Sequence, residues 1–476
     1  MRKFLLLAGW LLLTLPTSAT IRLHTLFTDH MVLQQQHRVP FAGTASPNEQ
    51  ITVHCSWLNE AMTTKADAEG HWQVNFTTPQ ATFTPQTIEI QGAGEELTLS
   101  DILIGEVWLC AGQSNMQMTL RGFPSQPVEG GLEEIAQAAT YKKLRLFHVP
   151  AKYAETRQDH CKGEWTRSTP ATASTFTAVG FVFGSRLSEA MDVPVGIISS
   201  AYGGSRIESW MDEATLAQFD KKDYIPKADK PYRDPVKIYN AMIAPIEGFP
   251  LAGVVWLQGE SNRRNAYVYA DMLRAMMGLW RTQWQQPSLP FIICHIAPLP
   301  YNSIGELGGA RVQEAQWQVT RTDKAAYLVG TSDIGDEKMV HYPKKRVVGE
   351  RVLYSAMANV YKVEGIPTSG PTLDQITFAK GKAIVRFAHA ERGLTPINQP
   401  IRCFELAGED LKFYPAEAKI GKDRATVEVK AKEVTEPRYV RYAFTNWHQT
   451  NLADVYGLPA IPFRTDSIRY ARPKLY

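Results

Sequence analysis

One stretch of the chain decides its fold class: Ile102-Leu103-Ile104-Gly105-Glu106-Val107-Trp108-Leu109-Cys110-Ala111-Gly112-Gln113-Ser114-Asn115-Met116. Its first part, 102–110, is an almost continuous apolar run, which is typical of a strand buried on both faces of a sheet. Four further runs of this kind occur at 195–201, 251–257, 289–296 and 326–330. Between them, apolar residues recur every three or four positions and predict helices at 179–191, 267–284 and 310–320. Strands that alternate with helices predict an α/β fold with a parallel sheet.

The flanking segments have a different pattern. Between 21 and 100, short apolar–polar alternations are separated by turn residues, which favours a small antiparallel sandwich. Similar alternation returns after about residue 365 and predicts either a second β module or the other half of the first. We therefore expect an N-terminal β domain at 20–100, an α/β domain at 101–364 and a β-rich region at 365–476.

The first residues have the layout of a secretory signal peptide. A basic start, Met1-Arg2-Lys3, precedes an apolar run and then Pro16-Thr17-Ser18-Ala19, which predicts a signal segment at 1–19. No later apolar run reaches the ~18 residues of a membrane span. The pattern predicts an exported protein with no membrane contact after cleavage. A bacterial periplasm is the preferred compartment, and an extracellular or lysosomal setting is the alternative.

Composition excludes several classes of function. The net charge is +3, and no dense basic block is present, so no nucleic-acid partner is expected. The five cysteines are far apart and form neither a disulfide framework nor a metal knuckle. No HExxH pattern or similar His/Asp spacing occurs, so we expect no metal and no other cofactor.

Polar residues collect where the predicted strands end, which is where ligands bind in parallel sheets. These clusters lie at 112–116, 202–206, 258–262 and 332–336. Ser114 is a candidate nucleophile, although a serine after a strand often only caps the next helix. A serine hydroxyl needs a base within hydrogen-bond reach. His341, beyond the last strand, is the best-placed base, and His295 is its competitor.

If Ser114 attacks an acyl group, the site also needs donors for the developing oxyanion. Backbone N–H groups of Ser114 and Gly204 are candidates, because the missing side chain of Gly204 lets the main chain approach a substrate closely. The side-chain amide of Gln258 or Asn262 is a further candidate. Each of these loops taken alone is also compatible with a simple turn.

Two motifs in this order are specific: Gly112-Gln113-Ser114-Asn115-Met116 and Gln258-Gly259-Glu260-Ser261-Asn262. With further matches at 26–34, 105–110, 194–204, 207–210, 239–245 and 457–466, the chain resembles the sialate O-acetylesterases of the SGNH-hydrolase superfamily. The resemblance covers nearly the whole mature chain.

This resemblance implies a flavodoxin-like, three-layer α/β/α core with a parallel sheet, flanked by β-sandwich-like regions. It also implies a serine esterase without a metal, which removes acetyl groups from sugars, typically O-acetylated sialic acid. By carry-over, Ser114 is the nucleophile and His341 the general base. The oxyanion hole comes from the N–H groups of Ser114 and Gly204 together with a side chain of the Gln258 segment.

The sequence departs from the family beside the histidine. Relatives commonly place an aspartate two or three residues before it, whereas this chain has Lys338 and Met339 there. Either Asp333 or Asp336 orients His341, or a backbone carbonyl does so in a Ser–His dyad. The dyad is slightly favoured, because a methionine two residues before the histidine does not suit a polar relay.

Specificity for the sugar is expected from side chains around the acyl pocket. An arginine suits the carboxylate of a sialic acid, which makes Arg206, Arg263 and Arg264 candidates. Glu260 and Trp210 are further candidates for substrate contact, although core packing is the alternative for Trp210 and Trp256. Two other functions stay open: an acetylesterase for plant cell-wall sugars such as xylan, and a non-catalytic carbohydrate-binding protein.

Overall fold

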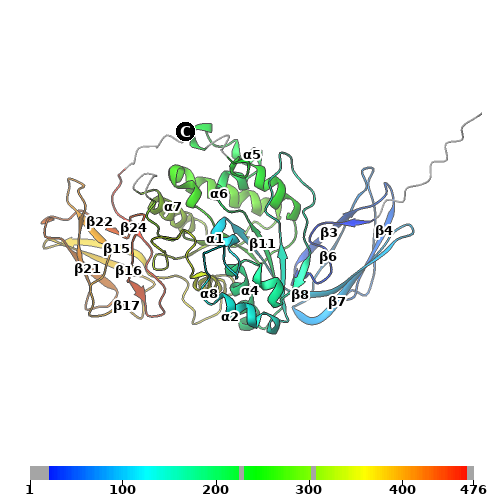
Figure 1. The fold of residues 1–476 in the computed structure, drawn as a ribbon, viewed down its shortest axis with the longest axis horizontal. Helices are drawn as coiled ribbons and strands as arrows, with labels where there is room; N and C mark the ends of the chain where they lie inside the picture. The colour runs from blue at the N-terminus through cyan, green and yellow to red at the C-terminus, as the bar shows by residue number, and fades with distance from the viewer. Residues whose placement is uncertain (1–20, 225–229, 302–306, 469–476) are drawn as a thin grey trace, which may run out of the picture.

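The computed structural model describes residues 21–224, 230–301 and 307–468. A central α/β region lies between two β regions at opposite ends of the molecule (Figure 1). The signal segment expected at 1–19 lies outside the described residues. Within the described part of the chain, no helix combines the length and the apolar character needed to cross a membrane.

The central sheet contains the five strands expected from the apolar runs. They are β8 (Glu96–Gly112), β11 (Val195–Ala201), β12 (Gly253–Leu257), β13 (Phe291–Cys294) and β14 (Ala326–Val329). They run parallel in the spatial order β11-β8-β12-β13-β14, which is 2-1-3-4-5 in chain order. β11 and β12 lie on opposite sides of β8, so the order of the strands changes direction at β8. The carboxyl end of β8 is therefore the position where a ligand is expected.

One parallel strand was not predicted from the sequence. β9 (Leu144–His148) extends the sheet beyond β11, and the antiparallel β10 (Trp165–Arg167) forms the edge. Arg145 interrupts the apolar pattern of β9, yet it is buried because its guanidinium pairs with Asp101 at 3.1 Å. The charged residue of this ion pair breaks the apolar run, so β9 could not be recognised from the hydropathy of the sequence.

The expected helices are present as α4 (Ala178–Met191), α6 (Ala266–Gln283) and α7 (Gly308–Thr322). Val107 and Leu109 of β8 belong to one hydrophobic core together with residues of α6 and α7. Trp108 and Cys110 belong to a second core with residues of α4 and α8 (Lys345–Ser355). Burial on both faces explains the continuous apolar run of β8. The short helices are α1 (Ser114–Gln117), α2 (Gly131–Gln137), α3 (Pro170–Ser174) and α5 (Glu213–Leu216).

The N-terminal β region continues directly into the central sheet. Its strands are β1 (Arg22–Leu23), β2 (Val32–Gln34), β3 (Arg38–Thr44), β4 (Gln50–Cys55), β5 (Met62–Lys65), β6 (His71–Thr77) and β7 (Thr82–Gln91). The first half of β8 pairs with β7, and β2 runs parallel to residues Leu103–Gly105 of the same strand. The boundary expected between residues 100 and 101 thus falls inside β8, where no linker exists.

The C-terminal β region is a second module with its own core. One sheet has the order β15 (Thr372–Ala379), β16 (Lys382–Ala388), β21 (Thr426–Lys430), β20 (Glu417–Ile420). The other has the order β19 (Tyr414–Pro415), β18 (Phe404–Ala407), β22 (Tyr439–Tyr442), β24 (Phe463–Arg464), and β17 (Leu394–Thr395) pairs with β23 (Ala453–Asp454). Their apolar residues form a cluster separate from the two cores of the α/β region. The strands of this region thus share a core of their own.

Candidate active site

Ser114 begins helix α1 directly beyond the carboxyl end of β8. The preceding Gly112 has φ +145°, and a Cβ there would lie only 2.1 Å from the carbonyl oxygen of Leu257 in β12. Glycine is therefore required where the chain leaves the sheet. The N–H of Ser114 lies in the first turn of the helix, where N–H groups have no intrahelical partner, so it can donate to an oxyanion.

The side chain of Gln113 joins two of the predicted clusters. Its backbone N–H donates to the carbonyl oxygen of Leu257 at 3.0 Å. Its Oε1 accepts from the backbone N–H groups of Gly259 and Ser261 at 3.3 and 3.4 Å. The loops that follow β8 and β12 therefore form one rigid unit around Ser114.

The loop after β11 lies against the same serine. A Cβ on Gly203 would lie 3.3 Å from Cβ of Ser114, and the N–H of Gly203 donates to Gln117 Oε1 at 2.9 Å. Gly204 has φ +75°, a conformation that favours glycine. Within the described residues its N–H has no hydrogen-bond acceptor. Gly204 thus has the neighbourhood and the free donor expected of an oxyanion hole.

Asn115 ties the loop of His341 to the turn that carries Ser114. The Nδ2 of Asn115 donates to the carbonyl oxygen of Val340 at 3.2 Å, which ties the residue after the serine to the residue before the histidine. His341 is half-buried, and this burial together with the nearby Lys345 ammonium lowers its pKa. In the described residues no direct hydrogen bond joins Ser114 to His341, a bond that often tightens only when substrate binds.

The Nδ1 nitrogen of His341 contacts Gln126, a residue that was not predicted from the sequence. His341 Nδ1 lies 2.6 Å from Gln126 Oε1. The ring of Phe123 packs edge-on against the imidazole, with 5.1 Å between ring centroids. Neither residue belongs to a motif at a strand end, so the sequence carried no signal for them.

The two aspartates expected to orient His341 have other partners. Both carboxylate oxygens of Asp333 lie 2.7 Å from the guanidinium of Arg351 in α8. Asp336 Oδ1 accepts from the backbone N–H groups of Lys338 and Met339 at 2.8 and 2.9 Å. The expectation that Asp333 or Asp336 completes a triad is wrong for this reason, and the alternative of a backbone carbonyl is replaced by the side chain of Gln126.

Gln258 and Asn262, expected as oxyanion donors, are completely buried and have no free N–H. Gln258 Nε2 donates to the carbonyl oxygen of Ser205 at 3.1 Å and to Asn262 Oδ1 at 2.8 Å. Asn262 Nδ2 donates to Glu208 at 2.7 Å and to Asn265 at 3.2 Å. These amides hold the loops after β11 and β12 together, which corrects their predicted role.

Glu260 and Arg263, expected at the substrate, also have structural contacts. Glu260 is buried, accepts from Asn115 Nδ2 at 2.6 Å, and has a raised pKa because burial penalises its charge. Arg263 donates to the carbonyl oxygen of Glu260, and its guanidinium lies 3.7 Å from the ring centroid of Tyr301. Both side chains stabilise the loop after β12, which corrects the expectation of substrate contact.

Trp210 is completely buried and is part of the core. Its Nε1 donates to Ser205 Oγ at 3.0 Å, and its ring packs edge-on against Trp256 at 5.6 Å. Stacking on a sugar is therefore excluded for Trp210. Arg206 is half-buried and lies near Glu208. Burial raises the pKa of the Glu208 carboxyl, and the positive charge of Arg206 opposes this rise.

A buried lysine beneath the site was also missed. Lys345, at the start of α8, is completely buried and donates from Nζ to Asn115 Oδ1. Burial lowers its pKa to about 7, an effect that the carboxyl of Glu260 opposes. Asn115 therefore lies between a buried lysine and a buried glutamate, and this trio connects the serine turn, the loop after β12 and α8.

The competing histidine, His295, is completely buried, and its burial lowers its pKa to about 3. It cannot reach a substrate. Among the described residues, no group of three or more His, Cys, Asp or Glu side chains could hold a metal ion.

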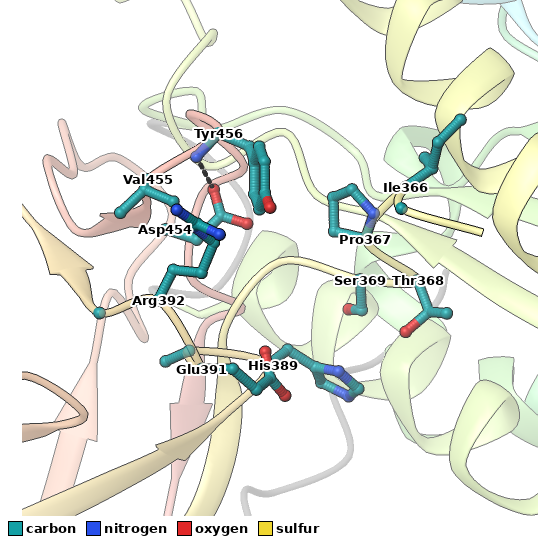
Figure 2. A pocket seen from close by; sticks show the side chains of 13 residues that line it. Ile366, Pro367, Thr368, Ser369, His389, Glu391, Arg392, Asp454, Val455 and Tyr456 are labelled. Atoms are coloured by element: carbon teal, nitrogen blue, oxygen red, sulfur yellow. Dashed lines mark hydrogen bonds between the residues drawn. The ribbon is translucent and has the colours of Figure 1, made fainter.

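A separate cavity of about 320 Å³ lies where the C-terminal module meets the segment 365–369 (Figure 2). His389 and Ser369 both line it, but no hydrogen bond joins them in the described structure. The Asp454 carboxylate accepts from the backbone N–H of Tyr456 at 2.9 Å and so stabilises a turn.

The comparisons with known proteins agree with this geometry. A family model described as carbohydrate esterase, sialic acid-specific acetylesterase, matches residues 104–358. The chain belongs to this family. The matched range includes Ser114, Gly204 and His341 and excludes most of both flanking β regions.

Individual relatives give the same result for this esterase. It is 25% identical to the sialate O-acetylesterase of Homo sapiens over 405 residues, which cover 77% of this chain and 76% of that protein. It is also 25% identical to the Rattus norvegicus sialate O-acetylesterase over 433 residues, or 77% and 78% of the two chains. The crystal structure of a carbohydrate acetylesterase from Xanthomonas citri has a TM-score of 0.86 and 33% identity, and covers 94% of this chain and 100% of that one. The protein is therefore a carbohydrate acetylesterase, and the sequence-based expectation of an esterase is confirmed.

Proposed function

We propose that the protein removes O-acetyl groups from sugars through an acyl-serine intermediate, with Ser114 as nucleophile, His341 as general base and O-acetylated sialic acid as substrate. The observation that carries this proposal is the contact of Asn115 with the carbonyl oxygen of Val340, because it places the base-bearing loop against the serine turn. The half-buried His341 has a lowered pKa, so it is neutral at neutral pH and can accept a proton.

The chemistry runs in two steps. Ser114 Oγ attacks the acetyl carbonyl carbon while its proton passes to Nε2 of His341. The sugar oxygen then leaves with that proton, and the acetyl group stays on the serine. In the second step His341 takes a proton from water as the water oxygen attacks the acetyl carbon, and the imidazolium then returns this proton to Ser114 Oγ while acetic acid leaves and ionises to acetate. The N–H groups of Ser114 and Gly204 stabilise the oxyanion in both steps.

The order 2-1-3-4-5 of the five main strands supports the finer assignment of the fold. The same order describes flavodoxin-like sheets, and the nucleophile follows the first strand at the point where the order reverses. Separate cores on the two faces of β8 support helices on both sides. We therefore assign the α/β region to the three-layer SGNH type.

Arg233 supports a sialic acid as the substrate. Its Nε donates to the carbonyl oxygen of Gly204 at 3.2 Å, so a guanidinium lies beside the proposed oxyanion donor. Tyr232, next to it, stacks on Tyr202 with 4.6 Å between ring centroids. Arginine pairs well with the carboxylate that distinguishes sialic acid from neutral sugars. The curated relatives from human and rat are sialate O-acetylesterases.

An acetylated neutral polysaccharide such as xylan is the second candidate. It is favoured by the carbohydrate acetylesterase from Xanthomonas citri, which is more similar in sequence than the sialate O-acetylesterases, at 33% against 25% identity. Acetate release from O-acetylated sialic acid and from acetylated xylan, measured side by side, separates the two. Release from sialic acid alone supports the proposal, and release from xylan alone supports the alternative.

Two variants test the assignment of residues. Ser114→Ala is expected to abolish turnover of both sugars and of an aryl acetate, and full turnover would overturn the role of Ser114. Arg233→Gln is expected to weaken turnover of O-acetylated sialic acid by roughly tenfold more than turnover of the aryl acetate, which has no carboxylate. Equal effects on both esters would contradict the role of Arg233.

We also propose export, most simply to a bacterial periplasm. The basic start, apolar run and Ala19 of the sequence support this location. Fractionation of cells that express the full chain tests it: the protein is expected in the periplasmic fraction with an N-terminus at Thr20.

A further inference from the structure

Among the described residues, no carboxylate bonds to His341 as the orienting group of serine esterases does, and an amide occupies that place. We propose that Gln126 is the positioning residue of the general base: an uncharged side chain that fixes the tautomer of His341. This inference rests on the proposed role of His341. The contact joins residues 215 positions apart, with 2.6 Å between His341 Nδ1 and Gln126 Oε1.

The chemistry of the contact fixes where the proton lies. An amide oxygen accepts hydrogen bonds and cannot donate one. Nδ1 of His341 therefore carries the proton, and the lone pair of Nε2 is free to accept a proton from Ser114. This is the tautomer that a general base requires, and in the usual triad a carboxylate selects it.

A tight turn presents Gln126 to the imidazole. The carbonyl oxygen of Phe123 accepts from the N–H of Gln126 at 2.9 Å, and the N–H of Phe123 donates back at 3.1 Å. Pro124 occupies the second position, and Ser125 has φ +61° at the third, the combination found in type II turns. The Phe123 ring packs on the imidazole from the same turn. Two contacts from one four-residue turn thus hold the ring in place.

The charged groups around His341 leave it without a carboxylate partner among the described residues. Lys345 of α8 carries the nearby positive charge, and Glu260 is bonded to Asn115. Asp336 accepts from its own turn. The backbone N–H of the exposed Glu129 donates to the carbonyl oxygen of Pro343, and its side chain has no hydrogen bond among the described residues. The imidazolium formed during catalysis is therefore stabilised by the dipole of an amide and not by a full negative charge.

This arrangement has a consequence for the working pH. A carboxylate against a histidine favours the charged imidazole and raises its pKa, whereas an amide does not. His341 therefore stays neutral, and competent as a base, at lower pH than a histidine held by aspartate. The esterase is expected to keep its activity in mildly acidic medium.

Gln126→Glu and Gln126→Ala test the proposal through the pH dependence of kcat/KM for an aryl acetate. Glutamate matches glutamine in shape and adds the missing charge. Gln126→Glu is expected to keep substantial activity and to shift the acid limb of the pH profile to higher pH by about one unit. Gln126→Ala is expected to lower kcat on the order of 100-fold with little change in KM, because the imidazole is no longer aligned.

Glu129→Gln is the matched control, since it changes an exposed charge just beyond the same turn and is expected to leave the profile unchanged. An unchanged acid limb in Gln126→Glu, or wild-type kcat in a folded Gln126→Ala, would overturn the role of Gln126. If Gln126→Ala does not fold, the shift of the acid limb in Gln126→Glu alone tests the role of Gln126. Failure of the proposed function is distinguishable, because then Ser114→Ala would keep turning over the ester.

Discussion

Asp333 shows how a single residue can be read wrongly from its position. It follows the last strand of the sheet, close in sequence to the base, which made it a plausible third member of a triad. In the structure Arg351 takes both of its oxygens, and the same guanidinium donates to the carbonyl oxygen of Gly330 at 3.0 Å. Asp333 thus ties the segment after β14 to α8 and does not contact His341.

Asp333→Asn is expected to leave kcat/KM close to the wild-type value. Loss of an orienting carboxylate would instead cost up to roughly ten-thousand-fold in rate. The same substitution is expected to destabilise the fold by about 1–3 kcal/mol, since Arg351 is left largely buried without its counter-charge. Steady-state kinetics and urea unfolding measure the two effects. Asp336→Asn serves as the control for the exposed turn, and a large kinetic loss in either variant would contradict the assignment to Gln126.

At the scale of elements, Lys345 and Glu260 bind the start of α8 to the loop after β12. Both side chains are buried. Asn115 lies between them and forms a hydrogen bond with each. Helix α8 follows His341 directly, so this contact fixes the loop that carries the base. The hydropathy pattern could not reveal a buried lysine, because a charge is tolerated in a core only when its partner is supplied by another element.

Lys345→Met is expected to lower stability by about 3 kcal/mol, because Glu260 is left buried without its counter-charge. The double variant Lys345→Met/Glu260→Gln is expected to recover part of this loss, and strictly additive losses would contradict the coupling. Urea unfolding of the three variants provides the measurement.

The pH dependence of stability tests the same lysine. Its pKa is about 7 in the folded protein against 10.5 for an ordinary lysine. Between these values the unfolded chain binds more protons, so the contribution of Lys345 makes the protein more stable as pH rises. Lys345→Met is expected to remove this rise, and an unchanged slope of stability between pH 7 and 10 would contradict the lowered pKa.

For the whole molecule, the attachment of the C-terminal module matters most for stability. Arg464 of β24 reaches across to Glu314 of α7, with distances of 2.8 and 3.2 Å. Asn446 adds contacts to Leu299 and Gly309 on the α/β side. The module has its own core, and these polar contacts couple it to the α/β region.

Arg464→Met is expected to weaken this coupling by about 1 kcal/mol and to separate the unfolding of the C-terminal module from that of the α/β region. Tryptophan fluorescence and far-ultraviolet circular dichroism in urea would then give different midpoints. Arg386→Met is the matched control, because its pair with Asp423 is exposed and lies inside the module. Identical midpoints in Arg464→Met would show that the remaining contacts are sufficient to couple the two parts.

The sequence by itself determined the buried strands and the main helices, and it singled out Ser114 and His341 as candidates for the nucleophile and the base. These features depend on neighbours along the chain: continuous apolar runs, a three-to-four periodicity, and small or polar residues directly after a strand.

Only the tertiary structure decided which polar groups serve the chemistry and which serve packing. Gln258 and Asn262 have suitable side chains, but three-dimensional packing uses all their N–H groups. Gln126 lies in an ordinary turn, and only the fold brings it to a histidine 215 residues away. Partner choice among polar groups depends on distances across the folded chain, which no local pattern encodes.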